Sequence, residues 1–219
     1  MTPCGDDTEA NPAYLSAMSG PLLAIDTAAP RLQLALLQDQ HVETLIEEMP
    51  QGQAERILPA IDELLERNGV VYAALGRIAV TTGPGSFTGL RIGLSAARGL
   101  GLALDIPVVG IPSLHALSLA TRCEVTAVLL DARRGEAYFQ VFSGPAIPVG
   151  EPALLPMDEA QRRVPHGAEV LGSPFVDIAA MARLGALLDP TAYPPIAAYI
   201  RGADAKPQEK FRVARVTDA

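Results

Sequence analysis

Lysine is almost absent from this sequence: its two lysines, Lys206 and Lys210, both lie close to the C-terminus. Chemistry or phosphate contact elsewhere in the chain must therefore use arginine, carboxylates or backbone N–H groups. The formal net charge is −8 and the isoelectric point is about 4.9. Because attraction to a phosphate backbone needs clustered cations, this charge argues against direct binding of nucleic acid.

Cysteine and histidine are also scarce. Cys4 and Cys123 form no CxxC pair, so we expect neither a disulfide framework nor a zinc site. This cysteine usage fits a reducing compartment. The three histidines, His41, His115 and His166, are too scattered for a metal site. No apolar run approaches the roughly 20 residues that cross a bilayer, and the N-terminus has acids where a signal peptide is basic. We therefore expect a cytoplasmic protein.

The composition is that of a globular protein, with 49% hydrophobic and 19% charged residues. A chain of 219 residues can form two compact lobes. We predict a mobile extension at 1–20, a first lobe at 21–111, and a second, smaller lobe with a C-terminal tail at 112–219.

Hydrophobic periodicity predicts an α/β layer, with helices packed on a mixed sheet. The predicted elements of the first half are strands at 22–26, 32–36, 77–81 and 106–111, and helices at 53–68 and 88–104. The second half starts in the same way, with strands at 127–131 and 136–142, which favours an internal duplication. Five prolines between Pro145 and Pro165 then predict a loop-rich stretch.

The turn Gly83–Gly89 (GPGSFTG) connects a predicted strand to a predicted helix. Ser86 or Thr88 can cap this helix, whose free N–H groups favour an anion. The turn therefore has two interpretations: it binds a phosphate or nucleotide, or it is a tight turn whose role is packing. It is not a P-loop, because Leu90 follows Gly89 where a lysine is required. It is not a nucleophile elbow either, because no glycines flank Ser86 at the required spacing.

The helix after this turn carries small residues at four-residue spacing: Gly89, Gly93, Ala97 and Gly101. Glycine inside a helix costs roughly 1 kcal/mol relative to alanine, so this ridge indicates a close neighbour. The neighbour is either the protein's own sheet or a helix of another chain, and we favour the second.

Two aspartates, Asp26 and Asp131, each end a strand at a turn. Such a carboxylate can hold a metal or orient a nucleophile, or it can accept backbone N–H bonds of the turn. We favour the structural role for both. Arg133 and Arg134 in the second hairpin are candidates for contact with an anion or a partner.

Five blocks in order resemble the bacterial TsaB family, also called YeaZ. They are LLAIDTA at 22–28, RILP at 56–59, GPGSFTGLRIG at 83–93, DARRGEAY at 131–138 and YIR at 199–201. The resemblance implies two RNase H-like lobes of the actin-like ATPase superfamily. It also implies a role in making threonylcarbamoyladenosine on tRNA, as a non-catalytic scaffold that binds the transferase TsaD.

The same resemblance implies where partners and cofactors bind. ATP and metal are expected on the TsaD-like and TsaE-like partner subunits, with none on this chain alone, and tRNA is contacted only indirectly. The sequence leaves open whether the free chain forms a homodimer through the same helices, as apolar interfaces often do when their partner is absent. The implied partner interface is Ile57, Leu58, Ile61, Leu65, Gly89, Ile92, Gly93, Ala96, Ala97 and Leu100. Asp26, Ser86 and Thr88 are the candidate contacts for a nucleotide or anion at that interface, and the sequence leaves open whether a nucleotide is shared there.

Two other classes of function remain open at this point. A small-molecule phosphotransferase of the same superfamily would use Asp26 and the glycine turn, and it would bind Mg-ATP without a partner. A metallopeptidase would bind a metal ion, which a metal assay would detect.

Overall fold

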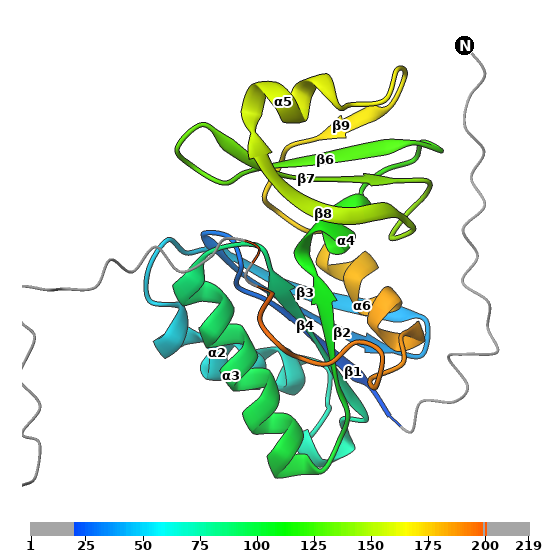
Figure 1. Ribbon diagram of the computed structural model, residues 1–219. Helices are drawn as coiled ribbons and strands as arrows, with labels where there is room; N and C mark the ends of the chain where they lie inside the picture. Colours follow the sequence, from blue (N-terminus) through cyan, green and yellow to red (C-terminus); the bar gives the residue numbers. More distant parts are fainter. Residues whose placement is uncertain (1–19, 199, 201–219) are drawn as a thin grey trace, which may run out of the picture.

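The computed structural model describes residues 20–198 and residue 200. Two β-sheets lie one above the other, and helices cover both faces of the larger one (Figure 1). The strands are β1 (Leu22–Asp26), β2 (Arg31–Gln38), β3 (His41–Glu48), β4 (Arg77–Gly83), β5 (Val108–Pro112), β6 (Thr126–Asp131), β7 (Glu136–Phe142), β8 (Pro148–Pro156) and β9 (Glu169–Leu171). The α-helices are α2 (Gln53–Arg67), α3 (Phe87–Leu104), α4 (Ser113–Ser118), α5 (Met157–Arg162) and α6 (Ile178–Leu187), and a 3₁₀-helix spans Tyr72–Ala74.

The first sheet has the strand order β3-β2-β1-β4-β5. Strands β1, β2 and β3 are antiparallel neighbours, whereas β4 and β5 run parallel to β1. Successive side chains of β1 point to opposite faces. Leu23 and Ile25 belong to the core under α2 and α3, and Leu22 and Ala24 belong to the core under α6. Burial of both faces explains why β1 is an uninterrupted apolar run.

The second sheet repeats this arrangement with the order β8-β7-β6-β9. Strands β6, β7 and β8 are antiparallel neighbours, and β9 runs parallel to β6 on its other side. Asp26 and Asp131 end the corresponding strands β1 and β6. The topology therefore confirms the duplication that the sequence pattern predicts.

Strand β8 was not expected, because its prolines predict a loop. It lies at the edge of the second sheet and pairs only with β7 among the described strands. Proline has no backbone N–H to donate to a neighbouring strand. An edge strand tolerates it because the outer side of that strand has no neighbour to bond. The prolines of β8 are Pro148, Pro152 and Pro156.

Helix α6 corrects the predicted division into lobes at residue 111. The helix comes from the second half of the chain, yet it lies against the first sheet (Figure 1). A Cβ placed on Gly185 would be 2.6 Å from the Cβ of Ala79 in β4. The chain therefore returns to the first lobe after completing the second sheet.

Arg77 of β4 holds the end of α6. Its Nη1 donates hydrogen bonds to the carbonyl oxygens of Gly185, Ala186 and Leu188, at 3.0, 3.2 and 2.9 Å. Burial lowers the pKa of this guanidinium below its ordinary value. The last carbonyls of a helix have no partner within it, so this arginine acts as a C-terminal cap.

Replacing Arg77 with methionine should lower the free energy of unfolding by about 2 kcal/mol, the usual effect of losing hydrogen bonds to a charged donor. Urea denaturation followed by circular dichroism measures this change. Arg183→Met on the exposed side of α6 is the control, with a change within about 0.5 kcal/mol. Equal losses in both variants would contradict the capping role.

None of the described helices is both long enough and apolar enough to cross a bilayer.

Candidate functional site

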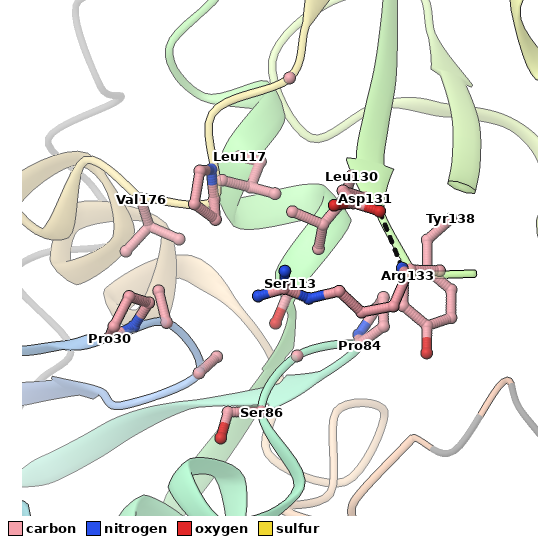
Figure 2. A pocket seen from close by; sticks show the side chains of 16 residues that line it. Pro30, Pro84, Ser86, Ser113, Leu117, Leu130, Asp131, Arg133, Tyr138 and Val176 are labelled. Atoms are coloured by element: carbon pink, nitrogen blue, oxygen red, sulfur yellow. Dashed lines mark hydrogen bonds between the residues drawn. The ribbon is translucent and has the colours of Figure 1, made fainter. Parts of the chain in front are cut away.

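A cavity of about 470 Å³ lies between the two sheets (Figure 2). The turns after β1 and β6 and the glycine turn after β4 form much of its wall, because all three strands end at the facing edges of their sheets. The lining residues are 28–30, 84–86 and 130–133, together with Ser113, Leu117, Tyr138, Gly172, Pro174 and Val176.

Asp26 is not among the residues that line this cavity. Its side chain is fully buried, and its Oδ1 accepts hydrogen bonds from the Thr81 hydroxyl at 2.7 Å and the Ala28 N–H at 3.1 Å. Its Oδ2 accepts from Nε2 of Gln33 at 3.0 Å. Burial raises the pKa of this carboxyl, although the three hydrogen bonds oppose the shift. Asp26 therefore ties β1 to β2 and β4, in agreement with the favoured structural role.

The glycine turn packs on the turn that follows β1. The Ser86 N–H donates to the Ala28 carbonyl at 2.7 Å, and a Cβ on Gly85 would be 2.8 Å from the Ala28 Cβ. Ser86 caps α3, because its Oγ accepts from the Gly89 N–H at 3.2 Å. Thr88 is exposed and does not line the cavity. The packing role of the turn is therefore shown, and Ser86 is also among the residues that line the cavity.

Asp131 has a different environment from Asp26. It is exposed and lines the cavity, and its Oδ1 accepts from the Arg133 N–H at 2.8 Å. Arg133 lines the cavity as well, whereas Arg134 does not. The two corresponding aspartates thus take separate roles, one in the core and one in the wall of the cavity.

Ser113 is a lining residue that the sequence analysis missed. It directly follows β5 and starts α4, a helix that the sequence pattern did not predict. Its position after a buried strand was the available signal, since such strand ends gather at one edge of a parallel sheet.

The glycine ridge of α3 faces the protein's own sheet, which corrects the favoured prediction of a partner helix. A Cβ on Gly89 would be 1.9 Å from the Thr27 carbonyl oxygen, and one on Gly93 would be 2.5 Å from the Thr27 Oγ1. A Cβ on Gly101 would be 2.3 Å from a methyl of Val108. The small residues allow α3 to lie close to β1 and β5.

The predicted interface residues divide into buried and accessible groups. The buried group belongs to the core of the chain: Ile57, Ile61, Leu65, Gly89, Gly93 and Ala97. Their apolar spacing reflects packing against the protein's own sheet. Helix residues that face the core have the same spacing as residues that face a partner, so the pattern does not distinguish the two. The accessible group consists of exposed Leu58 and of Ile92, Ala96 and Leu100, which are partly exposed.

No group of three or more His, Cys, Asp or Glu side chains suited to a metal ion is found among residues 20–198 and 200.

The chain is similar to other proteins over most of its length. It is 33% identical over 205 residues to an uncharacterized protein of Mycobacterium tuberculosis, covering 85% of this chain and 94% of that protein. It is 37% identical over 122 residues to "tRNA threonylcarbamoyladenosine biosynthesis protein TsaB" of Escherichia coli. The solved structure of YeaZ from Pseudomonas aeruginosa superposes with a TM-score of 0.70 at 25% identity, over 82% of this chain and 99% of that one. The chain belongs to the TsaB (YeaZ) family.

The match to the TsaB relatives is partial. The chain spans about half the length of the relatives named TsaB, 53% for the Escherichia coli protein and 52% for the Bacillus subtilis one. Residues 47–151 also match a family model described as "TsaD: tRNA N6-adenosine threonylcarbamoyltransferase". The two-lobed α/β fold expected for the TsaB family is confirmed by the YeaZ superposition. Of the YIR block, Tyr199 and Arg201 lie outside the described residues.

Proposed function

We propose that this chain acts in the synthesis of threonylcarbamoyladenosine on tRNA, as a non-catalytic subunit that binds and supports a TsaD-type transferase. The similarity to TsaB proteins, whose name places them in this biosynthesis, carries the proposal. ATP and metal then belong to the TsaD-like and TsaE-like subunits, and the acidic chain contacts tRNA only through them.

The outer surface of α2 and α3 is the proposed seat for the transferase. Leu58 of α2 and Phe87 and Leu102 of α3 are exposed apolar side chains. Gly99, also on α3, would have no atom within 4 Å of an added Cβ, so a second helix can approach the backbone there. Exposed apolar side chains on two neighbouring helices favour a protein interface. The same surface would pair two copies of the chain when the transferase is absent.

Leu58→Arg should weaken binding of the TsaD-type transferase by roughly tenfold or more, because it places a charge within an apolar contact. Co-purification and titration of the two full-length chains measure the effect. Val170→Arg is the matched control, since Val170 lies on β9 of the second sheet and is 52% exposed, against 49% for Leu58. Unchanged binding by Leu58→Arg, or equal loss in both variants, would contradict the proposed seat.

The phosphotransferase alternative is tested by calorimetry of the isolated chain with Mg-ATP. A phosphotransferase must bind its nucleotide without a partner and turn over a substrate. The proposed scaffold should show no turnover by itself, so substrate turnover by the purified chain would overturn the proposal.

A further inference from the structure

The hydroxyl of Ser113 is a buried polar group without a partner. Ser113 lines the cavity between the sheets and is only 3% exposed, and its Oγ forms no hydrogen bond with any described residue. A buried hydroxyl that lacks a partner costs about 1–3 kcal/mol, so such groups normally have one. Its position in the cavity wall indicates that a bound molecule supplies the missing bond.

A cation faces the same space. Figure 2 shows the side chain of Arg133 extending across the cavity, with its guanidinium directed toward Ser113. Within residues 20–198, this guanidinium makes no hydrogen bond or ion pair. A guanidinium presents paired N–H donors that match a carboxylate. Arg133 and Ser113 together therefore offer donors to one anionic group.

The remaining wall is largely apolar. Much of it comes from proline and aliphatic side chains, which bind hydrocarbon surface rather than a sugar or a hydrated ion. These residues are Pro30, Pro84, Pro174, Leu117, Leu130 and Val176.

The charged residues that line the cavity favour a ligand with a single negative charge. Arg133 and Asp131 are the charged residues of the lining, so their formal charges cancel. A polyphosphate would meet one cation and one repelling carboxylate, with no lysine in the described chain to neutralise it. A monoanion can instead pair with Arg133 while its remainder lies against the apolar wall.

We propose that this cavity binds a small monocarboxylate with an apolar body, whose carboxylate is held by Arg133 and Ser113. This inference goes beyond the proposed scaffold role, because it gives the chain a ligand of its own at a site away from the outer surface of α2 and α3. The two proposals can fail separately, since carboxylate binding tests the cavity and transferase binding tests the scaffold role.

Calorimetry of the full chain with hexanoate, isovalerate and 3-phenylpropionate tests the proposal, with the neutral amide of each acid and ADP as comparisons. At least one carboxylate should bind more tightly than its own amide and than ADP. Arg133→Asn should weaken that binding by roughly tenfold or more, because a charged hydrogen-bond donor is lost. Arg134→Asn should leave it unchanged, since Arg134 does not line the cavity. Both arginines have positive φ, at 65° and 55°, a conformation that asparagine accepts, so the two variants are matched.

Ser113→Ala gives a second readout that does not depend on Arg133. The variant should bind the carboxylate several-fold more weakly, yet unfold at a higher temperature without ligand, because the unpartnered hydroxyl is gone. Absence of binding by all three carboxylates would overturn the proposal. Tighter binding of ADP, or equal weakening by Arg134→Asn, would overturn it as well.

Discussion

Replacing Gly89 with alanine should lower the free energy of unfolding by about 3 kcal/mol, at the upper end of the usual cost of overpacking. The new Cβ would be 1.9 Å from the carbonyl oxygen of Thr27. That oxygen belongs to the backbone of the turn after β1, so it cannot rotate away. The Thr27 hydroxyl also donates to the Gly89 carbonyl at 2.7 Å, which fixes the distance between turn and helix. Urea denaturation measures the loss.

The same substitution ten residues later on the same helix should have the opposite sign. Gly99 has nothing within 4 Å of a Cβ position, so Gly99→Ala gains only helix propensity, a stabilisation of about 1 kcal/mol. Opposite signs at Gly89 and Gly99 would show that contact with the sheet decides the effect. Similar changes at both positions would contradict the packing described for α3.

Asp26→Ala should also lower the free energy of unfolding by about 3 kcal/mol, because it leaves buried donors unpaired. The Thr81 hydroxyl and the Gln33 amide both donate to this carboxylate in the core. Asp26→Asn should cost less, since the asparagine oxygen can still accept from Thr81 and Gln33 can turn its own oxygen toward the new amide. Comparison of the two variants by urea denaturation separates the loss of hydrogen bonds from the loss of charge.

The charge of Asp26 should make stability depend on pH. Burial raises its pKa in the folded state above the ordinary value of 3.8. The folded state therefore holds the proton more tightly than the unfolded state, and the resulting stabilisation is full below pH 3.8. It is lost as the pH rises through the folded pKa. The wild type should lose stability over this window relative to Asp26→Asn, and parallel pH profiles for the two proteins would contradict the assignment.

The first sheet could be predicted largely from sequence. The apolar run Leu22–Asp26 and the helix starting at Gln53 have the bounds that their periodicity indicates. In both elements the apolar residues of the pattern are the buried residues, so the local sequence pattern is sufficient to predict their bounds. Strand β8 and helix α4 were missed, because proline content and short length conceal elements that the rest of the fold stabilises.

The candidate site could be predicted only in part. The turns at Asp26, Ser86 and Asp131 were found because a polar residue after an apolar strand is a local signal. Ser113 also follows a buried strand, but its lack of a hydrogen bond depends on neighbours distant in the chain, so the sequence did not single it out. The interface prediction failed for Gly93 and Ala97 because a small residue in a helix does not reveal which surface it contacts.

Local residue order was sufficient to establish the repeated strand–turn–strand units, the low density of cations and the family, because each is written in the type and spacing of neighbouring residues. Long-range packing was needed to establish that the ridge of α3 faces β1, that α6 returns to the first sheet, and that Asp26 is buried while Asp131 is exposed. These features depend on contacts between residues far apart in the chain. The side-chain periodicity of one segment does not identify the distant segment against which it packs.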